Sequence, residues 1–460
     1  MNLSHSQIPF VADLRFNTHG SIRSEWDKME QLLEGLPEQR APETTGRGAP
    51  RLVRAERRQV ELRPMSLDDM IGPEHLARLV WQMVQRFDLQ PLLDRILARE
   101  GVAGHPQTDP AILVSLWLYA TLDGVGSARE LARLCAEHAA YRWLSGGVGV
   151  NYHTLSDFRV DHTEWLDREL VRGLTGLMAS GAVDVQTVAQ DGLRVRASAG
   201  GSSFRREPKL RELECVARAR VAALKPEVSA EPPPRQSGLT PRQAAEKRAA
   251  TERLVRVEAA LAAMPEARMR KKRNKGEPNE ARVSTTDAEA RVMKLPDGGF
   301  RPAYNVQFCA ETQQGLVMAV MVTTSGADQD ALDPMHRKMT EAYGRPVANV
   351  LVDGGYVSQA GFERVTERGS AIYAPLGTTM VGSTSQPIID WRARMETEDA
   401  KTLYRLRGQT IEWVNACVRN NGLYKVTVRG QAKVLAVALW HALSHNVRRM
   451  LAMQPVAAAA

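Results

Sequence analysis

The sequence has few cysteines and no long hydrophobic run, and both absences exclude classes of protein. Cys135, Cys215, Cys309 and Cys417 lie far apart, with no Cys-x-x-Cys pair and no cluster of histidines. Structural zinc sites and disulfide frameworks need closely grouped ligands or partners, so this usage argues against a zinc site and favours a reducing compartment. The longest apolar runs, such as residues 111–119, are too short to cross a bilayer.

The amino-terminal residues and the charge balance indicate the compartment of the protein and the kind of partner that it binds. Residues 1–11 hold no charged segment followed by an apolar core, so we expect a cytoplasmic protein with no membrane partner. The net charge is +8 and the isoelectric point is near 9.4, which favours a polyanionic partner such as DNA. A chain of 460 residues is long enough for two or three domains.

The first part of the chain is predicted to pass from an extended segment to compact helices. Residues 36–64 are rich in proline, glycine and arginine, and we expect residues 1–65 to form a partly disordered extension. Residues 66–180 show helical spacing, including a strongly apolar helix at 111–122 that Asp109-Pro110 caps. Such a region is either a DNA-binding helical domain or a bundle with solvated arginines. The arginines available for DNA are Arg129, Arg133, Arg142 and Arg159.

Two segments are predicted to be strands that each deliver a carboxylate. Asn349 to Tyr356 runs from apolar β-formers into Asp353 and two glycines, and Thr187 to Ala197 places Asp191 and a glycine in a similar context. An acid at the carboxyl end of a buried strand lies at a ligand-binding edge of an α/β sheet. The alternative for the Asp353 segment is a turn built on its Asp-Gly pair.

Residues 201–283 interrupt this pattern with helix formers at 211–224 and 240–264, which predicts a helical hairpin inserted after the first strand. Residues 205–282 carry 20 Lys and Arg against 11 Asp and Glu, a net of +9, and so hold the excess positive charge of the whole chain. The densest run either contacts phosphates or is a solvated linker. Its candidate DNA-binding residues are Arg270, Lys271, Lys272 and Arg273.

After the insertion, strand and helix patterns alternate. Strands are predicted at 304–308, 316–322 and 371–375, with a helix at about 328–343 before the Asp353 strand. A further helix is expected from about 396 to 418. At 100° per residue, Arg405, Glu412 and Arg419 fall on one face of it, either as a carboxylate flanked by cations or as a surface charge stripe.

Three acids converging at one sheet edge, without Cys or His, suit hard oxygen-liganded cations, above all Mg²⁺. Two such ions about 3.5–4 Å apart activate water or a 3′-hydroxyl and stabilise the leaving oxygen of a phosphodiester. On a basic chain, this predicts phosphodiester cleavage or transfer.

Four ordered motifs resemble the DDE transposases of bacterial insertion sequences, and the group with a Tyr-Arg-Glu-Lys signature, the "eleven-eighty-two" type, is the most similar. The motifs are Asp191-Gly192-x3-Arg196-Ala197, Tyr304-Asn305-Val306-Gln307, Asp353-Gly354-Gly355-Tyr356, and Tyr404-x2-Arg407-x4-Glu412-x6-Arg419. The helical region also resembles that group's amino-terminal domain. Trp413 to Ala416 departs from the Pro-x-Phe-Gly that many members have after the third acid.

The resemblance implies an α/β fold, with an RNase H-like catalytic domain at 183–450 interrupted by the basic helical insertion at 201–283. It also implies an all-α DNA-binding domain at 66–180, and leaves a tail at 451–460. Asp191, Asp353 and Glu412 would be catalytic and hold two Mg²⁺ ions, with Mn²⁺ as an alternative. Tyr404 and Arg407 would contact the transposon end, and Arg419 stands where relatives have lysine.

The leading hypothesis is therefore a transposase that binds terminal inverted repeats, cleaves strand ends and joins 3′-hydroxyls to target DNA. Its partners would be the transposon ends, the target and further copies of itself in a synaptic complex, on the bacterial nucleoid. Two alternatives stay open: a catalytically inactive DNA-binding relative that represses the element, and a two-metal nuclease that never joins strands.

Overall fold

The fold is known from a computed structural model, which describes residues 64–101, 105–224, 240–273, 275–377 and 380–453. The predicted extension at 1–65 lies outside these ranges except for residues 64 and 65, and the predicted tail at 451–460 lies outside them except for residues 451–453. Within the described ranges, no helix is both long and apolar enough to span a bilayer.

The region from Asp68 to Ala179 is helical, as its sequence predicts. Helix α4 is its centre: the Asp109 side chain accepts a hydrogen bond from the Ala111 N–H at 2.8 Å, Pro110 occupies the first turn, and the helix is buried along its whole length. The elements are η1 (Asp68–Met70), α2 (Leu76–Val84), α3 (Gln90–Leu93), α4 (Pro110–Leu122), α5 (Ala128–Glu137), α6 (Ala139–Leu144), α7 (Tyr152–Asp161) and α8 (Thr163–Ala179).

Three of the four arginines proposed for DNA contact have structural partners in this region. Arg159 is buried, packs its guanidinium 4.6 Å from the centre of the Trp117 ring and donates to the Gly126 carbonyl. Arg133 is paired with Glu130 and Glu137 on its own helix. A third, Arg129, packs its guanidinium 5.1 Å from the centre of the Tyr152 ring, so Arg142 is the one of the four whose side chain has no such partner among the described residues.

A mixed sheet follows, with the strand order β4-β5-β1-β7-β8 and with β6 paired to β5. Pairing is antiparallel among β1, β4, β5 and β6, and parallel from β1 through β7 to β8. The strands are β1 (Thr187–Arg196), β4 (Arg291–Lys294), β5 (Phe300–Glu311), β6 (Val317–Thr323), β7 (Asn349–Leu351) and β8 (Ala371–Tyr373). The predicted alternation is confirmed by the intervening helices α12 (Leu332–Tyr343) and α13 (Gln359–Glu367).

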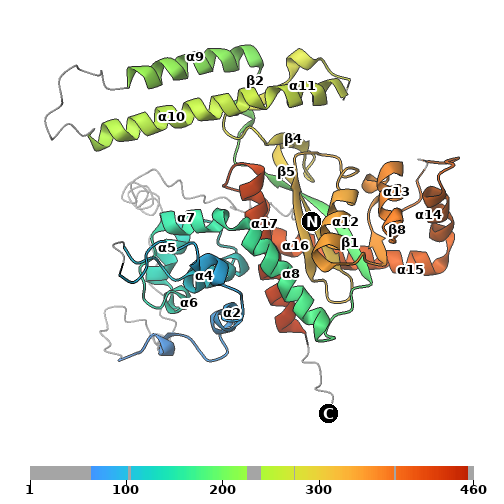
Figure 1. Ribbon diagram of the computed structural model, residues 1–460, viewed down its shortest axis with the longest axis horizontal. Coiled ribbons are helices and arrows are strands. Elements are labelled where there is room, and N and C mark those ends of the chain that lie inside the picture. The colour runs from blue at the N-terminus through green and yellow to red at the C-terminus, as the bar shows by residue number, and fades with distance from the viewer. Residues whose placement is uncertain (1–63, 102–104, 225–239, 274, 378–379, 454–460) are drawn as a thin grey trace, which may run out of the picture. The chain divides into compact units, whose positions relative to one another are not determined.

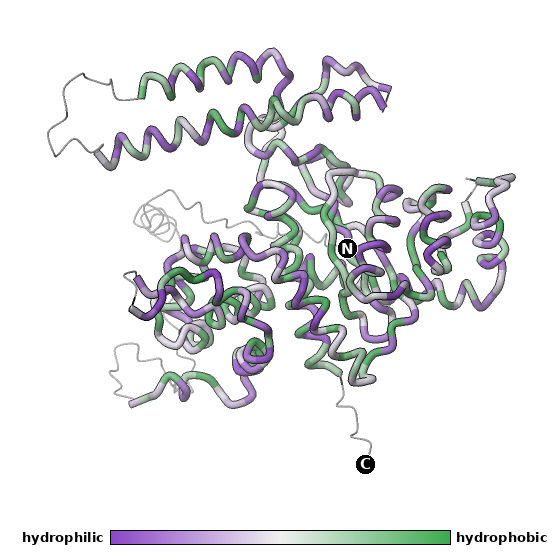
Figure 2. Tube along the Cα trace, in the orientation of Figure 1, coloured by the Kyte–Doolittle hydropathy of each residue, from purple (hydrophilic) through white to green (hydrophobic). Residues whose placement is uncertain are grey.

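The insertion is the predicted helical hairpin, and it leaves the sheet after β1 and returns before β4 (Figure 1). Its helices are α9 (Glu207–Ala223), α10 (Pro241–Ala262) and α11 (Met264–Arg273), and its short turns are η2 (Gly201–Ser203) and η3 (Pro278–Glu280). At the base, β2 (Phe204–Arg205) pairs with β3 (Val283–Ser284). The basic run at 268–273 is the hydrophilic end of α11 rather than a linker (Figure 2).

The carboxyl-terminal helices close the fold. They are α14 (Gln386–Glu396), α15 (Glu398–Arg407), the π-turn η5 (Gly408–Glu412), α16 (Trp413–Asn420) and α17 (Gln431–Ala452). Helix α17 packs against both the helical region and the sheet, so one hydrophobic core runs through both. On α17, the buried Trp440 donates to the Arg159 carbonyl at 2.9 Å, and Asn446 bonds the backbone of Val317.

Candidate active site

The strand register brings Asp191 and Asp353 level with each other. β1 and β7 are parallel, and Ala189 lies opposite Leu351. Each aspartate stands two residues beyond that pair, so both carboxylates leave the same face at neighbouring positions of the sheet edge. The chain turns directly after Asp353, whose carboxylate accepts from the Gly355 N–H at 2.8 Å.

Gly192, which follows the first aspartate, is a glycine because neighbouring side chains lie close to its Cα atom, and not because its backbone adopts an unusual angle. A Cβ on Gly192 would lie 2.5 Å from the Gln307 Nε2 atom and 2.6 Å from the oxygens of Asn305 and Asp328. These are hydrogen-bonded groups held on the sheet, so the space next to Asp191 cannot hold a side chain.

Gly192→Ala is therefore expected to destabilise the protein by about 1–3 kcal/mol through overpacking. Thermal or urea unfolding of the purified variant measures this. Gly173→Ala is the matched control, because Gly173 lies exposed on α8 with no atom within 4 Å of an added Cβ. That control should be neutral or more stable by up to about 1 kcal/mol, since alanine is the better helix former. Equal stability of the two variants would contradict the packing explanation.

Glu412 reaches the same site through a π-turn, and this corrects the predicted helix face. The helix expected at 396–418 is broken: α15 ends at Arg407 and the turn Gly408–Glu412 has π geometry. A π-turn adds one residue per turn, so it rotates Glu412 relative to the helix before it. Arg407, five residues earlier, contacts the Glu412 carboxylate at 2.9 Å. Arg405 and Arg419, which were predicted to share a face with Glu412, are exposed and form no ion pair with it among the described residues.

The guanidinium of Arg407 is the point at which the three acids meet. Its Nη2 atom lies 3.3 Å from an Asp191 oxygen and 3.9 Å from an Asp353 oxygen, while its Nη1 atom contacts Glu412. The side chain of Arg407 is 11% exposed, whereas that of Asp353 is 41% and that of Glu412 is 62% exposed. The acids thus form an open rim around one buried cation.

Burial sets the protonation behaviour of the first acid. Desolvation raises the pKa of Asp191 to about 6, although the Arg407 charge and the Gly192 N–H both work in the opposite direction. For Arg407, burial opposes the charged form, but the surrounding carboxylates, Asp191 foremost, outweigh it and raise its pKa. The position of the Arg407 guanidinium therefore stabilises a positively charged group.

Asp328 is a fourth carboxylate at the site, and the sequence motifs did not single it out. It lies between β6 and α12 and accepts from Asn305 at 2.6 Å, from Gln307 at 2.8 Å and from Arg194 at 3.2 Å. Gln307 in turn accepts from the buried Tyr356 hydroxyl. The Tyr-Asn-Val-Gln and Asp-Gly-Gly-Tyr motifs are thus joined through Asp328 and Gln307.

Asn415 is the second residue that the sequence did not predict. Its side-chain amide donates to an Asp191 oxygen at 3.1 Å, and the residue is buried on α16. It belongs to the Trp413 to Ala416 segment that departs from the family motif. In this chain, that segment therefore orients the first acid.

The predicted DNA-binding residues fall into two places. Tyr404 lies one turn before Arg407 on α15 and is half-buried. On α11, Arg270 donates to the Thr324 carbonyl at 2.8 Å and pairs with Glu266, whereas Lys271, Lys272 and Arg273 are exposed. Arg270, Lys271 and Arg273 line a hollow of about 700 Å³, and its lining also includes Ser325 to Ala327, directly before Asp328.

Within the described ranges, no three His, Cys, Asp or Glu side chains are grouped closely enough to hold a metal ion, because the three acids surround Arg407 instead. Comparison with family models gives evidence about the protein family, which the geometry of the site alone does not give. Residues 65–161 match a transposase domain (DUF772), and residues 378–451 match a transposase DDE domain. These two matches support a DDE transposase of an insertion sequence. Comparisons with curated proteins and with solved structures give no match.

The DDE match covers Tyr404, Arg407, Glu412 and Arg419, whereas Asp191 and Asp353 lie outside both matches. The DDE domain indicates an enzyme of metal-dependent DNA cleavage and transfer, and the two matched domains together support a function in transposition. The helical amino-terminal region of the chain corresponds to the other matched domain.

Proposed function

We propose that this transposase binds the terminal inverted repeats of its element, cleaves strand ends and joins the freed 3′-hydroxyls to target DNA, with Asp191, Asp353 and Glu412 as catalytic acids. One observation carries the assignment of these residues. Carboxylates from three distant segments of the chain meet at a single guanidinium, so the fold gathers negative charge around one point.

The donor set fits a hard divalent cation. It offers only carboxylate oxygens, and a positive group already stands among them. Asp191, Asp353 and Glu412 would hold two Mg²⁺ ions, or Mn²⁺. When bound, the ions would polarise the scissile phosphate and activate the attacking water or 3′-hydroxyl.

The chain's own residues prepare this site. Asn415 and the Gly192 N–H fix the two Asp191 oxygens, while Asn305 and Gln307 hold Asp328 beside the aspartates. Arg407 balances the carboxylates in the metal-free protein. On DNA binding, we propose that Arg407 and Tyr404 contact the transposon end, and that Arg419 adds a more distant cation.

The hollow beside α11 supports a path for DNA to the acids. Lys271 and Arg273 line it with Arg270, and its lining also includes Ser325 to Ala327, directly before Asp328. Lys272 is exposed on the same turn of α11. These cations would contact phosphates as the strand enters the site.

The fold supports the finer family assignment. Three antiparallel strands continued by two parallel strands, with helices between the latter, are the basis for proposing an RNase H-like catalytic domain at 183–450. The helical region at 66–180 would be the DNA-binding domain, and the "eleven-eighty-two" type remains the proposed group. Joining two ends requires at least two copies in the synaptic complex.

Metal removal tests the proposed function. Purified protein is incubated with labelled duplexes that carry the element's terminal repeats, with Mg²⁺ or with EDTA. We expect 3′-hydroxyl ends and joined products with Mg²⁺ and neither with EDTA, because the acids alone cannot stabilise the leaving oxygen. Binding without cleavage in either condition would favour the repressor alternative, and cleavage without joined products would favour a nuclease.

A further inference from the structure

The insertion hairpin carries a second basic surface, separate from the hollow beside α11. One face of α10 is turned toward α9, where Arg218 pairs with Glu258 at 3.1 Å and Arg220 pairs with Glu246. The opposite face lines a groove, with lining positions at spacings of three and four residues from Ala244 to Ala259.

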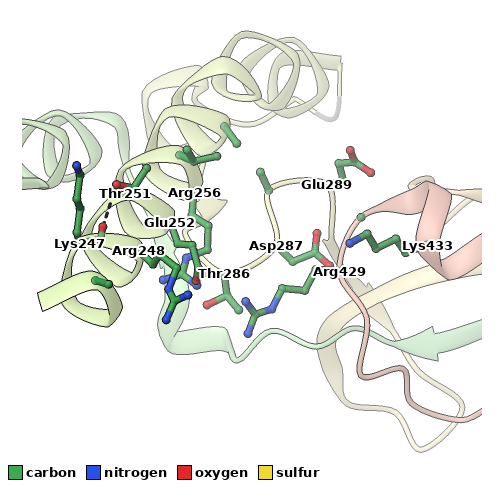
Figure 3. Close-up of a pocket in the computed structure, with 15 residues that line it drawn as sticks. Lys247, Arg248, Thr251, Glu252, Arg256, Thr286, Asp287, Glu289, Arg429 and Lys433 are labelled. Carbon is green, nitrogen blue, oxygen red and sulfur yellow. Dashed lines mark hydrogen bonds between the residues drawn. The ribbon is translucent and has the colours of Figure 1, made fainter. Parts of the chain in front are cut away.

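The other wall of this groove comes from the catalytic part of the chain. It is made by the loop Thr286–Glu289 and by Arg429, Gly430 and Lys433 at the start of α17 (Figure 3). The groove encloses about 890 Å³ and is larger than the hollow beside α11. It therefore joins the insertion to the catalytic part along a solvent-accessible track.

The groove carries unbalanced positive charge. Two of its three carboxylates already have partners in the protein: Asp287 accepts from the Tyr304 hydroxyl at 2.8 Å, and Glu289 accepts from the backbone N–H of Gln431. None of the groove cations forms an ion pair with a carboxylate among the described residues. Those cations are Lys247, Arg248, Arg256, Arg429 and Lys433.

Unlike the groove cations, several cations on the neighbouring helices form ion pairs with carboxylates of the protein. Arg211 and Arg268 both pair with Glu207, and Arg270 pairs with Glu266. Gathering the groove cations without such partners costs repulsion that a bound anion would remove. An anion is therefore the ligand that this surface recognises.

The spacing of the cations selects a nucleic-acid strand over a small anion. Arg248 and Arg256 both line the groove and are eight residues apart on α10, a distance of about 12 Å along a helix. A single phosphate cannot reach both, whereas this distance matches about four nucleotides of one strand in a duplex. Thr251 and Val255 lie between these cations and line the same groove.

The groove and the acids lie on opposite faces of β5. Tyr304 points to Asp287 in the groove wall, while its neighbour Asn305 points to Asp328 beside Asp191. We propose that the groove binds the phosphate backbone of duplex DNA at a distance from the cleaved phosphodiester. The proposal rests on the proposed function, because it takes the enzyme's DNA substrate as the ligand.

The test is the salt dependence of binding to a fluorescein-labelled duplex of arbitrary sequence, measured by anisotropy. Arg248→Gln, Arg256→Gln and Lys433→Gln are combined in one variant. We expect the affinity of this variant at 50 mM salt to be at least about tenfold lower than that of the wild type. The slope of log affinity against log salt should also be smaller by about 2.7, because each of the three lost phosphate contacts contributes about 0.9 to it. The matched control combines Arg242→Gln, Arg253→Gln and Lys209→Gln, exposed positions outside the groove, and should keep the wild-type slope.

Acetylation of the wild-type protein gives an independent measurement that no folding defect can affect. Bound duplex should slow acetylation of Lys247 and Lys433, read by mass spectrometry, and leave the exposed Lys209 on α9 unchanged. Unprotected groove lysines, or a wild-type slope in the groove variant, would overturn the proposal. If the wild type still cleaves DNA with Mg²⁺ in that case, the proposed function stands without the groove. A wild type that neither binds nor cleaves duplex would overturn both.

Discussion

Replacing Asp353 by asparagine is expected to lower the rate of DNA strand cleavage by at least about 10³-fold, because a full carboxylate charge is lost from the proposed metal-holding set. Asparagine has nearly the same shape, and its carbonyl oxygen can still accept from the Gly355 N–H. The turn after β7 should therefore survive, and DNA binding should stay within a few fold of wild type.

Cleavage and binding are measured separately to check this expectation. Products from labelled terminal-repeat duplexes give the rate, and anisotropy with the same duplex gives the affinity. Asp399→Asn is the matched control, since Asp399 is exposed in the first turn of α15 and contacts none of the three acids. Wild-type cleavage by the Asp353 variant would remove this residue from the mechanism. Equal loss in both variants would point to a general effect of the substitution.

The sequence predicted the local elements well because each depends on nearby residues. Helix α4 follows from its Asp-Pro cap and continuous apolar run, and the insertion from two stretches of helix formers around a proline loop. β4 was not predicted, since it is short and its pairing with β5 lies across a tight turn. The shared core also escaped prediction: α17 contacts α4 across more than 300 residues, as in the bond from Ser444 to the Leu118 carbonyl.

The site residues that belong to a sequence motif could be predicted, whereas those that only the fold brings to the site could not. Asp191 and Asp353 could be proposed because each follows a run of apolar β-forming residues, and the register then places them together, with Asp191 inside β1 and Asp353 just beyond the end of β7. Asp328 has no such context, and only its three side-chain donors show that it belongs to the site. Asn415 reaches Asp191 from 224 residues away. The π-turn before Glu412 has no sequence signal beyond its glycine, so a uniform 100° rotation selected the wrong arginine.

Arg407→Gln is expected to make the metal-free protein less stable and to make a divalent metal stabilise it more. The substitution removes the only described cation within 4 Å of all three acids and leaves their charges opposed. Because two of the three partners are more than one third exposed, solvent screening limits the loss in unfolding free energy to about 1–3 kcal/mol. In the wild type, metal and Arg407 compete for the same carboxylates, so the variant should bind Mn²⁺ about tenfold more tightly in the absence of DNA.

Thermal melting with and without Mg²⁺, and Mn²⁺ titration followed by electron paramagnetic resonance, measure both effects without reference to catalysis. Arg405→Gln is the control, because it removes an exposed charge two residues away on the same helix. If the uniform α-helical face were correct, Arg405→Gln would be the variant that gains metal affinity, since that face places Arg405 beside Glu412. The π-turn requires the opposite result, with a larger metal-induced rise in melting temperature only when Arg407 is replaced. The pair of variants thus tests directly which arginine holds the three carboxylates in the metal-free enzyme.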